Sequence, residues 1–201
     1  MIYNYKYLAS SIIIILITTL NATLLFGQGG YEKIGRYESG RAKVKANGLY
    51  GIIDMDGKEI VAPKYEIIQS FKDHRARVSL NKYWGIINWE GKEIVPVKYE
   101  KIGLFQNRKA MVQLNMKWGI INWDGKVIVA PKYDKIVTVN IGGYKIYNEG
   151  YWGLMSKDGK VLAAPKYEKI KAFENNRAKV LLNGNWGIID RNGKEIVKVG
   201  N

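Results

Sequence analysis

A repeat of fixed length constrains this chain more than any other feature. A tyrosine recurs at one constant interval, as Tyr31, Tyr65, Tyr99, Tyr133 and Tyr167. Each of these tyrosines is followed directly by an acidic residue, and an isoleucine stands three positions after each tyrosine. No insertion shifts this spacing, so residues 31–200 divide into five repeats of equal length: 31–64, 65–98, 99–132, 133–166 and 167–200. Such a repeat is one supersecondary element that buries its apolar side by stacking on its neighbours.

The pattern inside the repeat decides between helix and strand, because some helical repeats have the same length. Residues 75–78 alternate polar with apolar, and residues 84–87 and 92–95 are short runs rich in β-branched and aromatic residues. Between such runs lie pairs that supply the positive φ of hairpin turns: Asp56-Gly57, Asp124-Gly125, Asp158-Gly159 and Asn192-Gly193. We therefore predict all-β meanders, with strands in the first repeat near 42–45, 50–54, 58–62 and 65–71.

Five such meanders must pack on one another, since a lone meander of this size is only marginally stable. They could form blades of a propeller-like ring or steps of an open, twisted β-solenoid. The repeat is short for a propeller blade, which counts against a ring. A whole number of repeats without separate caps counts for it, because a ring hides its terminal edges. We favour the ring slightly.

A second recurring signature gives the repeat a family resemblance. Each repeat carries an aromatic–glycine pair and, seven positions later, a Gly-Lys pair; the aromatic pairs are Tyr50-Gly51, Trp84-Gly85, Trp118-Gly119, Trp152-Gly153 and Trp186-Gly187. Over the whole region after residue 30 the sequence resembles the bacterial WG-repeat family. The resemblance implies an interaction module of exported and surface proteins, without established catalytic residues. Tyr50 in place of Trp, and residues 137–144 of the fourth repeat, depart from the pattern.

The segment 1–27 reads as a targeting sequence. Lys6 precedes an uncharged stretch, residues 8–26, that contains a run of isoleucines, and small or polar residues follow at 27–30. This layout predicts a signal peptide over 1–27, cleaved near Gln28 or Gly29, then a short linker over 28–30. The alternative is an uncleaved membrane anchor, since the stretch approaches bilayer-spanning length. We therefore expect a secreted, periplasmic or cell-surface protein.

Composition narrows the chemistry. The chain has no cysteine and one histidine, His74, which excludes disulfides, thiolate chemistry and a histidine-based metal cluster; we expect no metal and no cofactor. Lys and Arg outnumber Asp and Glu by 32 to 18, a formal net charge of +14, which favours anionic partners. Export makes nucleic acid a poor candidate, and a membrane would be a partner only if the first segment stayed uncleaved.

Signals for catalysis are weak. No serine stands in a nucleophile elbow. Carboxylates such as Asp54, Glu66 and Asp190 could form the acid pair of a glycan-active hydrolase. The acids that follow the repeat tyrosine recur in step with the fold, however, which indicates structural pairing with nearby lysines. We expect a non-enzymatic binding module; the alternatives are such a hydrolase and a ligand-free structural component of the envelope.

The aromatic residues fall into two sets. The residue before the obligatory glycine is predicted to be the core residue that docks one repeat on the next; the set is Tyr50, Trp84, Trp118, Trp152 and Trp186. Trp89 and Trp123 instead occupy a slot that holds Met55, Lys157 and Arg191 elsewhere, so we predict that they are exposed. They are candidate ligand contacts, the alternative being cross-strand packing over the turn.

Lysines recur in two series, which could follow a polyanion along the array or merely keep strand edges soluble. The turn series is Lys58, Lys92, Lys126, Lys160 and Lys194, and the pre-tyrosine series is Lys64, Lys98, Lys132 and Lys166. The fourth repeat breaks symmetry at Gly142-Gly143-Tyr144, either by drift or as a specialised contact. The predicted ligand residues are Trp89, Trp123, Lys92, Lys126 and Tyr144, for an unknown protein or an anionic glycan.

Overall fold

A computed structural model of the chain describes residues 30–140 and 142–200. The predicted signal peptide, 1–27, and most of the short linker lie outside the described residues. Within these residues the chain forms twenty strands in five four-stranded sheets, and the predicted all-β class is confirmed. The described residues include no helix with the length and apolar character that crossing a bilayer requires.

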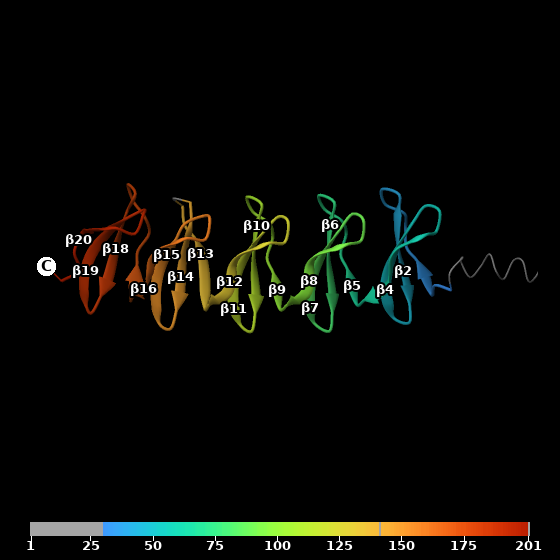
Figure 1. Cartoon of the computed structure of the whole chain (residues 1–201), viewed down its shortest axis with the longest axis horizontal. Coiled ribbons are helices and arrows are strands. Elements are labelled where there is room, and N and C mark those ends of the chain that lie inside the picture. Colours follow the sequence, from blue (N-terminus) through green and yellow to red (C-terminus); the bar gives the residue numbers. More distant parts are fainter. Residues whose placement is uncertain (1–29, 141, 201) are drawn as a thin grey trace, which may run out of the picture. The chain divides into compact units, whose positions relative to one another are not determined.

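Each sheet is an antiparallel meander whose strands pair in chain order (Figure 1). The sheets contain, in turn, β1 (Lys33–Ile34), β2 (Arg41–Ala46), β3 (Leu49–Asp54) and β4 (Glu59–Tyr65); β5 (Ile67–Ile68), β6 (Arg75–Leu80), β7 (Tyr83–Asn88) and β8 (Glu93–Tyr99); β9 (Lys101–Ile102), β10 (Lys109–Leu114), β11 (Lys117–Asn122) and β12 (Val127–Tyr133); β13 (Lys135–Thr138), β14 (Tyr144–Asn148), β15 (Tyr151–Met155) and β16 (Val161–Tyr167); and β17 (Lys169–Ile170), β18 (Arg177–Leu182), β19 (Asn185–Asp190) and β20 (Glu195–Val197).

The strands differ from the prediction at two places. The strand predicted over 58–62 continues through Pro63 to Tyr65, because it is an edge strand, where a proline costs no ladder hydrogen bond. The strand predicted over 65–71 is reduced to the two residues of β5.

Two hairpin turns shape each meander. Asn47 and Gly48, both with positive φ (51° and 77°), join β2 to β3, and Gly57 (φ 79°) closes the turn into β4.

The glycine of the aromatic–glycine pair is required by close approach of the edge strand. A Cβ atom built on Gly51 would lie 2.5 Å from the Val61 carbonyl oxygen and 2.8 Å from the Pro63 nitrogen. The β3–β4 register shifts between Tyr50 and Ile52, which marks a bulge at this point. Any side chain here would push the edge strand away, which explains why glycine recurs.

The chain divides into two compact units, and each is described by itself. Of the described residues, the first contains 30–81 together with Ile86–Glu93, and the second contains Lys82–Gly85, 94–140 and 142–200. The preference for a ring over an open spiral stays a prediction.

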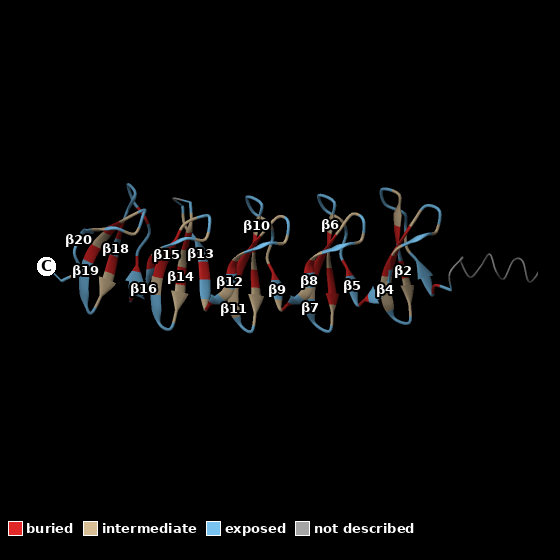
Figure 2. Cartoon of the chain, viewed as in Figure 1, coloured by how far each residue is buried: buried red, intermediate tan, exposed pale blue. Residues whose placement is uncertain are grey.

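Sheets of the second unit bury their apolar side chains against each other. One face of the β9–β12 sheet, with Ile120, Val129 and Tyr133, packs on the β13–β16 sheet through Ile146 and Met155. The opposite face of the β13–β16 sheet packs in the same way on the β17–β20 sheet, through the cluster Leu154, Ala163, Tyr167, Ile170, Phe173, Ala178, Val180 and Ile189. Burial concentrates in the middle of the strands, whereas many turn residues are exposed (Figure 2).

The predicted docking aromatics are less buried than expected. Tyr50, Trp84, Trp118 and Trp152 are half-buried, and Trp186 is 44% exposed, so the prediction that all five are core residues is wrong for Trp186. Trp118 and Trp152 border the two clusters described above, each on the face that the following sheet covers. Among the described residues no sheet follows β17–β20, which leaves Trp186 uncovered. Among the described residues the fully buried aromatics are the repeat tyrosines Tyr65, Tyr99 and Tyr167.

Candidate functional site

A groove lies between the first two sheets within the first compact unit. It encloses about 580 Å³ and is lined by β2, by the loop that precedes it and by the loop after β5. Three cationic side chains, Arg36, Arg41 and Lys43, line it together with Glu38 and Asp73. The surface of the groove therefore carries a net positive charge.

The indole ring of Trp89 forms part of the wall of this groove, and three other side chains contact it. The Arg41 guanidinium carbon lies 4.0 Å from the ring centroid of Trp89, and the same guanidinium donates a hydrogen bond to the Trp89 carbonyl oxygen. Phe71 and His74 meet the indole edge-on, at centroid distances of 4.8 and 5.5 Å. Burial lowers the pKa of Arg41, against the opposing effect of nearby carboxylates. Guanidinium and indole are therefore fixed before any ligand arrives.

Trp123 occupies the matching position in the second compact unit. Its ring meets Phe105 edge-on at 4.9 Å, and the Arg108 guanidinium carbon lies 6.0 Å from its centroid. Trp89 and Trp123 are both half-buried, so the prediction that they are exposed indoles is wrong. The phenylalanine that packs on each indole, Phe71 or Phe105, precedes it at the same spacing in both repeats. That co-occurrence was the sequence signal for packing.

A second groove, of about 890 Å³, lies two repeats further on, inside the second compact unit. Here the fourth repeat supplies Lys157 where the first groove has Trp89, Gly142 where it has His74, and Val139 where it has Phe71. With these smaller or more flexible side chains the second groove has the larger volume. Lys109 and Asp158 form an ion pair of 3.7 Å at its margin.

Tyr144, a predicted ligand residue, forms part of the wall of the second groove. Its side chain is 9% exposed and belongs to the core cluster between the β9–β12 and β13–β16 sheets. Burial, with a smaller effect of the Asp158 carboxylate, raises the pKa of Tyr144, so the ring stays neutral at physiological pH. Tyr144 therefore serves mainly as a packing residue, at a position where the other repeats have alanine.

The two lysine series differ in their surroundings. Lys92 and Lys126, predicted ligand residues, have exposed side chains, and their backbone amides donate to Asn88 and Asn122 Oδ1 at 2.8 Å. In the pre-tyrosine series Lys64 pairs with Glu93 at 3.3 Å, and Lys166 pairs with Glu195 at 2.9 Å. The turn series is thus open to solvent, whereas the other is partly neutralised.

The recurring acids have structural partners. Asp54 Oδ1 accepts hydrogen bonds from the Asp56 and Lys58 amides at 3.0 and 2.9 Å, and Asp190 Oδ1 repeats this turn with Asn192 and Lys194. Four of the five acids after the repeat tyrosine, all but Glu66, accept a hydrogen bond from a hairpin amide; they are Glu32, Glu100, Asp134 and Glu168. Of these, Asp134 also pairs with Lys117 at 2.6 Å, which lowers the pKa of Asp134. Within the described part of the chain no group of three or more His, Cys, Asp or Glu residues could hold a metal ion.

The profile of WG-containing repeats matches this sequence over residues 28–50, 50–84, 84–118, 118–144, 152–186 and 186–199. The chain therefore belongs to the WG-containing repeat family, which confirms the resemblance. A search of curated proteins finds no match.

Several solved structures match this chain at low identity. They include PorZ, a bacterial surface component of the type-IX secretion system of Porphyromonas gingivalis (11% identity, TM-score 0.35, covering 85% of this chain and 26% of that one). Hsv2p of Kluyveromyces lactis matches at 14% identity and TM-score 0.34, over 82% of this chain and 63% of that one. The extracellular domain of the putative one-component system BT4673 of B. thetaiotaomicron matches at 11% identity and TM-score 0.34, over 85% of this chain and 30% of that one. The chain thus spans less than two thirds of each, and TM-scores this low carry no argument about its role.

Proposed function

We propose that this protein is an exported binding module without catalytic activity, which acts at or outside the cell surface and binds an anionic glycan along its inter-sheet grooves. The observation that carries the proposal is the groove of the first compact unit. Arg36, Arg41 and Lys43 line it beside an indole whose orientation is fixed by Arg41. Cations beside a rigid aromatic wall suit a ligand that combines negative charge with a flat apolar ring face.

Three further features support this function. The uncharged segment before residue 27 has the layout of an export signal. The formal net charge of +14 attracts polyanions over a distance of about 10 Å at moderate salt. The candidate acids Asp54 and Asp190 and four of the five acids after the repeat tyrosine serve turns or ion pairs, which accounts for their recurrence without a hydrolytic role.

The test is binding of the purified protein to acidic and neutral polysaccharides at low and high salt. Arg41→Gln should weaken binding to the acidic polymers, since losing one desolvated cation costs on the order of 1 kcal/mol, about fivefold in affinity. Lys58→Gln is the matched control, because it removes the same charge from an exposed turn. Trp89→Ala should resemble Arg41→Gln.

Three results would contradict the proposal. Equal binding of neutral polymers, or equal loss in Lys58→Gln, would show that the groove does not select the ligand. Absence of binding under every condition would favour the ligand-free structural component.

A further inference from the structure

A hydrogen bond from a tyrosine hydroxyl to a glutamate carboxylate recurs in three repeats, and in two of them, Tyr65–Glu93 and Tyr167–Glu195, it links one sheet to the next. Tyr31 donates to Glu59 Oε1 at 2.6 Å, and Tyr65 donates to Glu93 Oε1 at 2.6 Å. In the last repeat Tyr167 donates to Glu195 at 3.0 Å. The sequence separation between tyrosine and acid is 28 in each pair, and the acid opens the fourth strand of its sheet.

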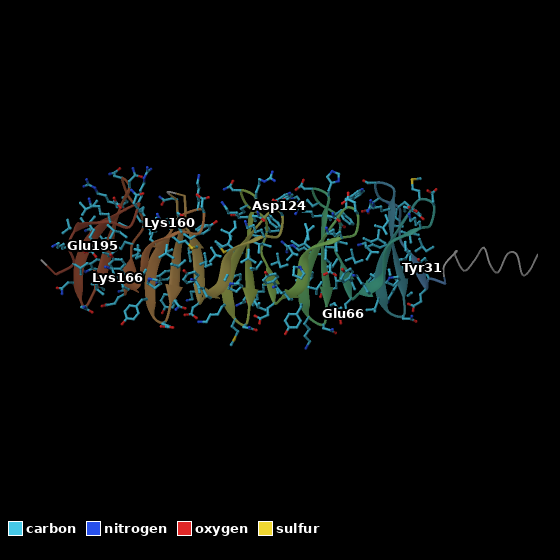
Figure 3. The ribbon with its side chains drawn as sticks, in the orientation of Figure 1. Tyr31, Glu66, Asp124, Lys160, Lys166 and Glu195 are labelled. Atoms are coloured by element: carbon cyan, nitrogen blue, oxygen red, sulfur yellow. The ribbon has the colours of Figure 1, made fainter. Side chains whose placement is uncertain are left out.

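A lysine completes the same carboxylate site in two of these cases. Lys64 Nζ lies 3.3 Å from Glu93 Oε1, and Lys166 Nζ lies 2.9 Å from Glu195 Oε1. Lys166 and Glu195 lie together in Figure 3. The protein thus carries its own template for carboxylate recognition, made of one phenolic O–H and one ammonium group, both donating to one oxygen.

Two repeats keep the donors but lack the acid. Valine takes the place of the glutamate at the matching position in both, as Val127 for Tyr99 and as Val161 for Tyr133. These valines are 42% and 41% exposed, whereas the two tyrosine rings are only 2% and 5% exposed. All of these residues belong to the second compact unit.

The lysines before these tyrosines keep the template geometry. Lys98 and Lys132 Nζ lie 5.4 and 5.3 Å from the centroids of the Tyr99 and Tyr133 rings. In the occupied sites the corresponding distances are 4.9 Å for Lys64 and 5.0 Å for Lys166. Among the described residues no carboxylate pairs with Lys98 or Lys132.

The two phenol groups are available as donors. Neither hydroxyl accepts or donates a hydrogen bond within the described residues, and neither is among the fully buried side-chain atoms without a partner there, of which Asn148 Oδ1 is the one found. Burial of its ring raises the pKa of Tyr99, which keeps that hydroxyl protonated at neutral pH.

We propose that Lys98–Tyr99 beside Val127, and Lys132–Tyr133 beside Val161, are two equivalent sites for the carboxylate groups of a uronic-acid polysaccharide. The inference rests on the proposed function and specifies its ligand. A carboxylate is the group that the occupied template binds, and the exposed valine offers an apolar contact for the C–H face of a sugar ring. Two identical sites one repeat apart favour a polymer over a single sugar, because a second contact on the same chain becomes intramolecular.

The test compares polyuronate binding by the unsubstituted protein with two double variants. Tyr99→Phe/Tyr133→Phe removes both hydroxyls without changing charge, and affinity should fall about tenfold. Val127→Glu/Val161→Glu places the protein's own carboxylate in each site. It should therefore abolish the part of the polyuronate affinity that these sites supply, while it raises thermal stability.

Each variant has a matched control. Tyr65→Phe/Tyr167→Phe removes the same number of hydroxyls from occupied sites, and it should lower thermal stability while leaving affinity unchanged. Met55→Glu/Met116→Glu adds the same charge at exposed side chains outside the sites, and affinity should fall less than twofold.

The outcomes separate this inference from the proposed function. Polyuronate binding that depends on Arg41 but is unchanged in Tyr99→Phe/Tyr133→Phe would overturn the two sites and leave the proposed function standing. Equal binding of polyglutamate, lost in the same variant, would assign the sites to protein carboxylates and overturn the glycan ligand. Failure of the unsubstituted protein to bind any acidic polysaccharide would overturn both.

Discussion

Replacing the glycine of an aromatic–glycine pair tests the feature that defines the repeat. In the fourth repeat a Cβ atom on Gly153 would lie 2.5 Å from the Ala163 carbonyl oxygen and 2.7 Å from the Pro165 nitrogen, where ordinary contact begins near 3.4 Å. Both are backbone atoms, so the overlap cannot be relieved by a rotamer change. We expect Gly153→Ala to lower the free energy of unfolding by about 3 kcal/mol, the upper part of the range for overpacked sites.

The control lies in the same sheet. Gly150 has φ of +92° but no atom within 4 Å of a built Cβ, so Gly150→Ala should cost only about 1 kcal/mol, from backbone strain. Urea unfolding followed by circular dichroism should show a midpoint lower by about 1–2 M for Gly153→Ala and clearly less for Gly150→Ala. If the Gly153 variant proved as stable as the Gly150 variant, close approach would not explain the recurring glycine.

Three further outcomes follow from the structure. Tyr65→Phe should lower the free energy of unfolding by about 1–2 kcal/mol in urea titrations, because it leaves the Glu93 carboxylate without its 2.6 Å donor. Burial and the adjacent carboxylate raise the pKa of Tyr31 from 10.0 to about 12, so its neutral form stabilises the fold fully below pH 10, and this contribution should vanish as pH rises through about 12; melting temperature and tyrosinate absorbance measure it. Trp186→Phe should remove the fluorescence most accessible to acrylamide, whereas Trp152→Phe should not, because Trp186 is the more exposed indole.

Much of the fold could be predicted because the repeat states it five times. Alternation in residues 75–78 and the Asp-Gly turns predicted three strands of each meander. The observed β2 and β3 follow the prediction closely, whereas β4 continues beyond it to Tyr65. The two-residue β5 could not be predicted from its run of apolar residues, since the pairing partner that limits it lies elsewhere in the repeat.

Exposure of single side chains was harder to predict. The slot of Trp89 tolerates charge in other repeats, which suggested an exposed indole, yet Phe71 and Arg41 cover two of its sides. For Trp186 the error was the opposite one, since it was predicted to be buried and is exposed. The matching residue Trp152 is covered by the sheet that follows it, whereas among the described residues no sheet follows that of Trp186. Sequence periodicity reports what a position does on average, not what packs on one copy.

The same reasoning indicates where ligand recognition should be sought. In a chain of near-identical repeats, a residue that serves the fold must recur, so specialised contacts arise where one copy departs from the others. A repeat that had lost both the donor and the acceptor of the tyrosine–glutamate hydrogen bond would only pack less stably on its neighbour. Val127 and Val161 remove the acceptor while Lys98–Tyr99 and Lys132–Tyr133 keep the donors. If the valines had arisen by drift alone, restoring glutamate would stabilise the protein without altering binding, and that combination is the result that separates a lost ion pair from a binding site.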